Sequence, residues 1–247
     1  MLCPHGLAFA RAPPLFQLTC ARPSHYNDRL VSTLNPSVSV KRPRRTSRRR
    51  VREVVAEFRR TSILEAAQSV FARHGFSNTT VELIAQAAGV AKGTLYLYFP
   101  SKAAIYSAAV VEGLRELAQE TARVLTSGGD IRHVLRDFFI TRLRYFEQRA
   151  DFFRIYSVEV GNLGRAAAHI RQEYARLYDV QMELLEHALN AAARSGHIRA
   201  VDVRIVATAA LDLSHALVVR HVRGANEQPE SDVDAVLDLL WKGIQKR

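Results

Sequence analysis

The apolar residues of this chain recur at helical spacing from residue 53 to the end, and this periodicity limits the fold more than any other feature. Ile63, Ala67, Val70 and Phe71 fall at i, i+4, i+7 and i+8, the positions of one buried helix face. Alternation of apolar and polar residues, the pattern of a half-buried strand, never persists for the length of a strand. The pattern predicts an all-α fold.

Glycine-containing breaks divide this stretch into helices. One helix is expected to end at Gly75 in the left-handed conformation, with Phe76 packing back on it. The box Thr79-x-x-Glu82 is expected to begin the next helix, which Gly89 ends before a short helix over residues 91–99. Further helices are predicted over residues 101–126, 131–148, 150–160, 165–194, 202–223 and 231–245, the last with Ser231 as its N-cap.

The charge is unevenly distributed. The chain carries 35 Lys and Arg against 24 Asp and Glu, a net charge of +11, but residues 1–60 hold thirteen of the basic residues and only three of the acidic ones. Such an excess favours a polyanionic partner, either nucleic acid or an anionic membrane surface. The residues expected to act as a phosphate-binding arm are Arg44, Arg45, Arg48, Arg49 and Arg50. A solvated tail without a partner is the alternative.

Residues 1–52 are predicted to be a disordered tail rich in Pro and Arg, because no helical or strand period is sustained there. Two origins stay open for residues 1–50: a native arm, or a stretch upstream of the true start codon. Neither a secretory signal nor a membrane span is expected, and the chain is expected in the cytoplasm. Cys3 and Cys20, the two cysteines, lack C-x-x-C spacing, which argues against a disulfide framework or a cysteine zinc site.

A helix, a glycine-containing turn and a short helix over about residues 80–99 form the pattern of a helix-turn-helix, whose second helix enters the DNA major groove. Gly93 removes a side chain where the backbone would approach DNA, and Thr94 can reach a base edge or a thymine methyl group. The donors suited to phosphates are Lys92, Tyr96, Tyr98 and Lys102. As alternatives, the lysines are ordinary surface residues and the tyrosines pack in the domain.

The stretch from Ile63 to Lys102 resembles the DNA-binding domain of TetR-family regulators through Phe71-Ala72-Arg73-His74-Gly75-Phe76, Ala88-Gly89-Val90 and Lys92-Gly93-Thr94-Leu95-Tyr96. The resemblance implies a homodimeric, all-helical regulator that binds double-stranded, palindromic operator DNA. It implies a DNA-binding domain over residues 53–106 and an effector-binding and dimerisation domain over 107–247. The DNA-contacting positions that it implies are Thr80, Lys92, Gly93, Thr94, Tyr96, Tyr98 and Lys102. Ala91 departs from the family, which often has a capping Ser there, a loss of about 1 kcal/mol.

The second domain offers a candidate effector pocket and a candidate dimer interface. The aromatic residues assigned to the pocket are Phe138, Phe139, Phe146, Phe153, Tyr156 and Tyr174. The resemblance implies that the last two helices pair with their symmetry mates through the stripes Val206, Ala209, Ala210, Leu213 and Leu217, and Val233, Val236, Leu237, Leu240 and Ile244. Ordinary core packing is the alternative for both sets.

No motif of catalysis is present, and Glu183 and His187 lack a third metal ligand, so no catalytic residue, metal or cofactor is expected. The expected function is a ligand-responsive transcriptional regulator, a repressor released from DNA by a small-molecule effector of unknown identity. An architectural or weakly specific DNA-binding protein driven by the arginine-rich arm, and a regulator acting as an activator, are the alternatives.

Overall fold

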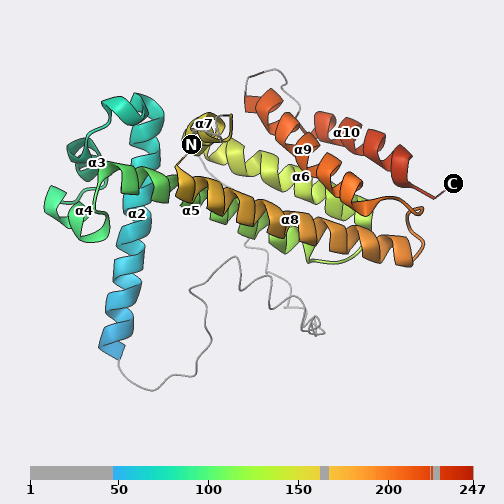
Figure 1. The fold of residues 1–247 in the computed structure, drawn as a ribbon, viewed down its shortest axis with the longest axis horizontal. Coiled ribbons are helices and arrows are strands. Elements are labelled where there is room, and N and C mark those ends of the chain that lie inside the picture. Colours follow the sequence, from blue (N-terminus) through green and yellow to red (C-terminus); the bar gives the residue numbers. More distant parts are fainter. Residues whose placement is uncertain (1–46, 162–166, 223, 225–228, 247) are drawn as a thin grey trace, which may run out of the picture.

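The computed structural model describes residues 47–161, 167–222, 224 and 229–246, and within them the fold is all-α (Figure 1). The helices are α2 (Ser47–Asn78), α3 (Val81–Ala87), α4 (Lys92–Tyr98), α5 (Lys102–Leu125), α6 (Ile131–Gln148), α7 (Ala150–Gly161), α8 (Ala168–Arg194), α9 (Val203–Val222) and α10 (Pro229–Ile244). The strongly periodic helices of the second half lie within a few residues of their predicted ranges. The predicted all-α class is therefore confirmed.

Helices α2, α3 and α4 form a small unit at one end of the molecule (Figure 1). Ile63, Phe71, Ile84 and Leu95 are all buried in it, so the periodic apolar residues form the core that their spacing predicts. The buried Gln68 amide donates to the carbonyl of Ala109 (2.9 Å), which ties α2 to α5.

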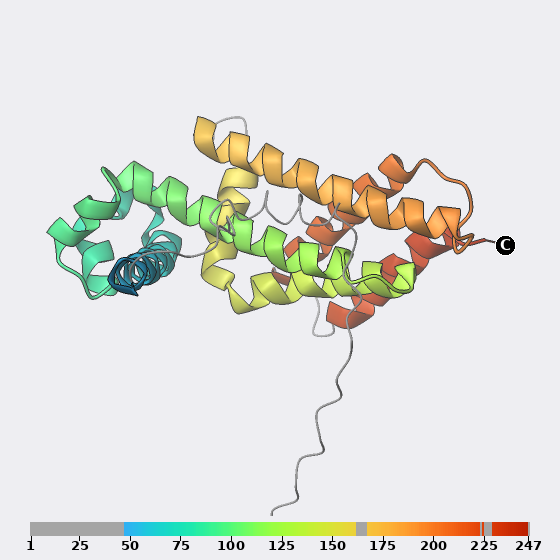
Figure 2. The ribbon, with the colours of Figure 1, turned by 90° about the horizontal axis from the view of Figure 1, so that it is seen from below.

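Helix α5 leaves this unit and continues without a break into the larger bundle of α5, α6, α8, α9 and α10, while α7 crosses between the two parts (Figures 1 and 2). The expected domain boundary at residues 106 and 107 falls inside this helix. Helix α5 therefore belongs to both parts and connects them.

Local chemistry shifts three helix ends from the predicted positions. The N-cap of α3 is Thr80, whose Oγ1 accepts from the amide of Leu83 (3.2 Å), whereas Thr79 donates to the carbonyl of Gly75. Helix α10 begins at Pro229, where a missing amide hydrogen costs nothing, so Ser231 lies inside the helix and is not its N-cap. Gly75 has φ 70° and ψ 168°, a glycine conformation but not the predicted left-handed helical one.

Residues 47–52, which were predicted to belong to the disordered tail, are helical because α2 begins at Ser47, and residues 1–46 lie outside the described residues. The first turns of α2 project beyond the rest of the unit (Figure 1) and leave Val54 and Phe58 exposed. Of the predicted basic arm, Arg44 and Arg45 lie outside the described residues, Arg48 and Arg49 lie in the first turn of α2, and Arg50 is exposed on it.

The apolar stripes of α9 and α10 serve mainly the core of their own chain, which corrects their assignment to a dimer interface. The buried members are Val206, Ala210, Leu217, Val233, Leu237 and Ile244, and the half-buried members are Ala209, Leu213, Val236 and Leu240. Helix α9 is long and apolar enough to cross a membrane, a test that a core helix packed on α6, α8 and α10 also passes.

Candidate functional site

Helices α3 and α4, joined by a turn at Gly89, form a helix-turn-helix at the tip of the small unit (Figure 1). Gly89 has φ 64°, a conformation that favours glycine. Val90 packs against the core, and its amide donates to the carbonyl of Ala85 (3.0 Å), which fixes the turn. The N-cap of α4 is Ala91, with no side-chain hydrogen bond, so the expected weak cap is confirmed.

Helix α4 has one buried side and one open side. Leu95 and the following Phe99 are buried, whereas Lys92, Gly93 and Tyr96 are exposed. Thr94 is half-buried, and Tyr98 is half-buried against the core. The open side thus combines a cation, a phenol and a position without a side chain.

Gly93 has no heavy atom within 4 Å of the point that a Cβ atom would occupy, and its φ is not positive. Neither packing nor backbone conformation within the chain therefore requires glycine at this position. The position leaves room for the close approach of another molecule.

Lys92 forms an ion pair with Glu82 of α3 at 2.5 Å, and its ammonium lies 5.9 Å from the centre of the Tyr96 ring. The hydrogen bond between them lowers the pKa of Glu82 and raises that of Lys92. Because both side chains are exposed, the pair contributes little to stability, and the ammonium is free to exchange this partner for another anion.

Lys102 is differently engaged. Its ammonium donates to the carbonyls of Phe76 (2.7 Å), Ser77 (3.3 Å) and Thr79 (2.8 Å) and lies 4.5 Å from the centre of the Phe76 ring. Three carbonyls occupy the three donors of an ammonium group. The side chain therefore joins the end of α2 to the start of α5, and its contact with DNA phosphate stays a prediction.

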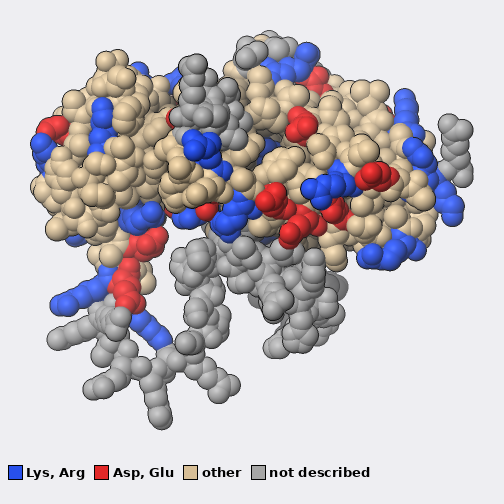
Figure 3. Space-filling view, in the orientation of Figure 1, with Lys and Arg blue, Asp and Glu red and all other residues tan. Residues whose placement is uncertain are grey.

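The face of the molecule shown in Figure 3 carries charges of both signs. Figure 3 shows Lys and Arg side chains interspersed with Asp and Glu on the face in view. Several form pairs between helices, such as Arg136 with Asp234 at 2.7 Å and Arg220 with Asp232 at 2.8 Å. Opposite charges thus partly offset one another at these helix contacts.

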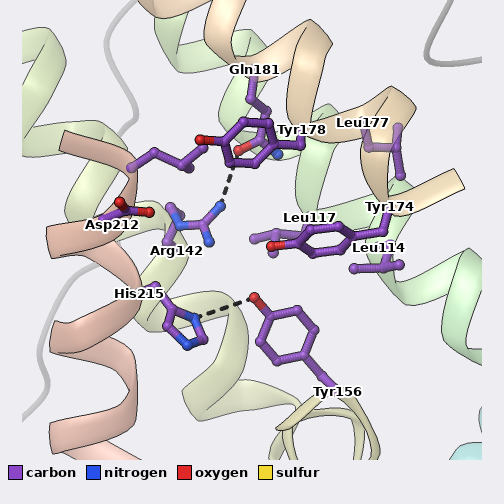
Figure 4. A pocket seen from close by; sticks show the side chains of 11 residues that line it. Leu114, Leu117, Arg142, Tyr156, Tyr174, Leu177, Tyr178, Gln181, Asp212 and His215 are labelled. Atoms are coloured by element: carbon purple, nitrogen blue, oxygen red, sulfur yellow. Dashed lines mark hydrogen bonds between the residues drawn. The ribbon is translucent and has the colours of Figure 1, made fainter. Parts of the chain in front are cut away.

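A cavity of about 100 Å³ lies inside the larger bundle (Figure 4). Five helices contribute to its wall, with Leu114 from α5, Arg142 from α6, Tyr156 from α7, Gln181 from α8 and His215 from α9. Figure 4 shows the hydroxyl groups of Tyr156 and Tyr174 directed toward the Arg142 guanidinium. The Tyr156 hydroxyl lies 3.3 Å from Nδ1 of His215.

Burial changes the ionisation of these groups. It raises the pKa of Tyr156, and it raises the pKa of Tyr174 to about 12. It lowers the pKa of His215, which the positive charge of Arg142 lowers further. At neutral pH the cavity therefore holds neutral tyrosines and a neutral histidine around one guanidinium.

The six aromatic residues assigned to an effector pocket fall into two groups. Tyr156 and Tyr174 line the cavity, whereas the four phenylalanines pack in the core: Phe138, Phe139, Phe146 and Phe153. Phe146 packs on Phe152, Phe153 and Tyr156, with ring centres 4.8–5.9 Å apart. Core packing explains these phenylalanines, so their assignment to the pocket is not supported.

Arg142, Gln181 and Asp212 line the cavity and were not among the sequence candidates. The sequence did contain a signal for Arg142, which lies on the same helix face as four buried residues. The face is formed, at i, i+3, i+4, i+7 and i+11, by Leu135, Phe138, Phe139, Arg142 and Phe146. A cation on an otherwise apolar helix stripe indicates a buried charge.

Comparison with known proteins finds bacterial regulators similar to this chain. Residues 63–109 match the family model of bacterial regulatory proteins, tetR family. The HTH-type transcriptional repressor KstR2 of Rhodococcus jostii is 27% identical over 188 residues, which cover 75% of this chain and 91% of that protein. The family model covers the helix-turn-helix, and the relative extends the similarity into the C-terminal helices.

Solved structures share the fold. The TetR-family transcriptional regulator PfmR of Thermus thermophilus is 27% identical, with a TM-score of 0.60, over 73% of this chain and 97% of that one. FadR of Bacillus subtilis, solved in complex with stearoyl-CoA, is 23% identical, with a TM-score of 0.59, over 75% of this chain and 99% of that one. The fold is therefore shared with solved transcriptional regulators.

Proposed function

This chain belongs to the TetR family of DNA-binding transcriptional regulators, which are not enzymes, and from that premise we propose that it is a ligand-responsive repressor. It acts in the cytoplasm, binds palindromic operator DNA as a homodimer, and releases the operator when a small molecule binds. Recognition of DNA rests on the open side of α4. A relative of this chain, KstR2, is named as a repressor, which supports repression over activation.

The observation that carries the proposal is the open position at Gly93 beside exposed donors. A glycine that the chain itself does not require, next to Lys92 and Tyr96, suits the close approach of a DNA backbone. Thr94 is placed to contact a base edge, and Tyr98 and Thr80 are the flanking candidates for phosphate. Lys102 acts indirectly, since it holds α2 and α5 together beneath the helix-turn-helix.

The dimer forms through the outer sides of α9 and α10. Ile205 on α9 and Leu239 on α10 are 67% and 72% exposed, and the same helices carry small exposed residues, among them Ala216 and Gly243. Small exposed residues permit close helix packing, and a two-fold dimer presents two α4 helices to the two halves of a palindrome. The substitution Leu239→Glu should shift the dimer toward monomer in light scattering and weaken binding to the full palindrome.

Ligand response is supported by the cavity and by the continuity of α5. Leu114 and Leu117 of α5 line the cavity, and the same helix begins at Lys102 beside the helix-turn-helix. A ligand that favours one position of α5 would change the separation of the two α4 helices in the dimer. Only one separation fits half-sites a helical turn apart.

The deciding experiment is the selection of bound sequences from random duplex DNA by the full chain, followed by affinity measurements on the selected and on a scrambled duplex. We expect a palindrome, and we expect Thr94→Ala to lose about 1–3 kcal/mol of preference at one or two base positions. Equal affinity for both duplexes, falling steeply with salt on each, would instead identify an architectural binder driven by the arm. A reporter gene that responds upward to the protein would identify an activator.

A further inference from the structure

We propose that the cavity in the larger bundle binds a small organic carboxylate, with Arg142 as its anchor. The inference rests on the proposed function, because it names the chemical class of the effector. It is drawn from the charge inside the cavity, from the polar groups around that charge, and from the volume that they enclose.

Arg142 is a buried cation without a counter-charge. Its side chain is 4% exposed, and the guanidinium donates through one terminal nitrogen to Oε1 of Gln181 (3.1 Å). Within the described part of the chain, its Nε has no hydrogen-bond partner and no carboxylate pairs with it. Asp212, a carboxylate on the cavity wall, is exposed and forms no ion pair with Arg142.

An unpaired buried charge is costly, and arginine does not escape the cost by losing its proton. A protein gains nothing in stability from such a group, so its presence indicates a use. The planar guanidinium binds carboxylates through two parallel hydrogen bonds, and the interaction is strong where water is excluded.

The surroundings select an anion over other ligands. The neutral Tyr156, Tyr174 and His215 supply polar groups without negative charge, and Asp212, the one carboxylate among the lining residues, is exposed. A protonated amine would instead be repelled by the positive charge of Arg142. The leucines Leu114, Leu117 and Leu177 form an apolar wall for a short hydrocarbon portion.

The volume limits the size of the acid. A cavity of about 100 Å³ is smaller than the roughly 150 Å³ cavity that admits benzene in an engineered protein. Without rearrangement the cavity holds about four to six non-hydrogen atoms. A short-chain carboxylate such as butyrate has this size, and its uncharged isostere butyramide differs from it mainly in charge.

The test titrates the full chain with butyrate and with butyramide, by calorimetry and by the ring resonances of His215. We expect butyrate to bind and to shift those resonances, and butyramide to bind at least tenfold more weakly. Arg142→Met should weaken butyrate binding at least tenfold, whereas Arg144→Met, which removes an exposed arginine of the same helix, should leave it unchanged. Equal binding of both ligands, binding retained by Arg142→Met, or no binding of butyrate would overturn the proposal.

Thermal unfolding separates an anchor from a structural residue. Because Arg142→Met removes a buried unpaired charge and keeps most of the volume, its midpoint without ligand should equal or exceed that of the wild type. A midpoint that falls steeply would show that Arg142 serves the fold, and would overturn its assignment as a ligand anchor. The butyrate and butyramide titrations use the wild type and stay decisive if the variant fails to fold.

Operator binding distinguishes this inference from the proposed function. If butyrate binds through Arg142 while the affinity for the selected palindrome stays unchanged, the cavity assignment holds and release by this ligand fails. If a palindrome is bound but butyrate is not, regulation of DNA stands and the carboxylate assignment is overturned.

Discussion

Gly113 of α5 packs against Phe152 of α7, and replacing it with alanine should destabilise the protein. A Cβ atom at this position would lie 2.3 Å from Cε2 of Phe152 and 2.5 Å from two further atoms of that ring. Non-bonded carbon atoms normally approach to about 3.5–4.0 Å. The overlap therefore amounts to about 1 Å or more at three atoms, and one of the two helices or the ring has to move.

The ring has little freedom to move. Phe152 is 1% exposed, stacked on Phe146 at 5.9 Å, and edge-on to Tyr145 at 6.0 Å. Overpacking of this kind lowers the free energy of unfolding by about 1–3 kcal/mol, whereas alanine in place of a helical glycine raises it by about 1 kcal/mol. Since three atoms overlap, we expect the upper part of that range and a net loss of about 1–2 kcal/mol.

Thermal unfolding at fixed protein concentration measures the effect. For a chain of this size the midpoint should fall by about 2–8 °C for Gly113→Ala. Gly93→Ala is the matched control, because Gly93 is exposed in α4 with no heavy atom within 4 Å of its Cβ position, and its midpoint without DNA should hold or rise. Phe152→Leu should recover part of the loss when combined with Gly113→Ala. A Gly113→Ala midpoint at or above the wild-type value would refute the reasoning.

Four further predictions test other parts of the structure. Lys102→Met removes three hydrogen bonds to main-chain carbonyls and should lower the free energy of unfolding, measured without DNA in urea titrations, by about 1–3 kcal/mol. An unchanged free energy of unfolding together with weaker DNA binding would instead indicate that Lys102 contacts phosphate. Burial alone would raise the pKa of Glu173, but hydrogen bonds from Arg176 and Arg115 outweigh it and lower the pKa to about 2. Since the folded-state pKa lies below the ordinary value of 4.5, the stabilisation by ionised Glu173 is complete above pH 4.5 and is lost as the pH falls from 4.5 toward 2. In urea titrations at acid pH, the free energy of unfolding of Glu173→Gln should therefore fall less over this range than that of the wild type. Ala91→Ser should supply the missing cap of α4 and raise stability by about 0.5–1 kcal/mol, and an unchanged midpoint would show that α4 does not limit unfolding. Removal of residues 1–46 should make the slope of log affinity against log salt shallower by about 0.9 for each phosphate that the arm neutralises, while a disappearance of sequence preference would contradict an accessory arm.

The sequence by itself determined the helical elements and the helix-turn-helix. Apolar spacing and glycine breaks are local properties, so they place helices such as α6 and α8 within a few residues of their observed ends. They also place Leu95 and Phe99 in the core and leave Lys92, Gly93 and Tyr96 open. The missing side-chain cap at Ala91 could be read in the same way, because capping depends on one residue.

Only the tertiary structure decided what each apolar or charged face meets. The apolar stripes of α9 and α10 have the same sequence pattern whether they face their own chain or a second copy. The fold buries most of their residues in the core of their own chain. The same ambiguity applies to the aromatic residues near Phe146. Lys102 meets its carbonyl partners from residues more than twenty positions earlier in the chain, which no local pattern encodes. The cavity around Arg142 assembles residues from five helices, because a buried charge acquires its surroundings only when distant segments pack together.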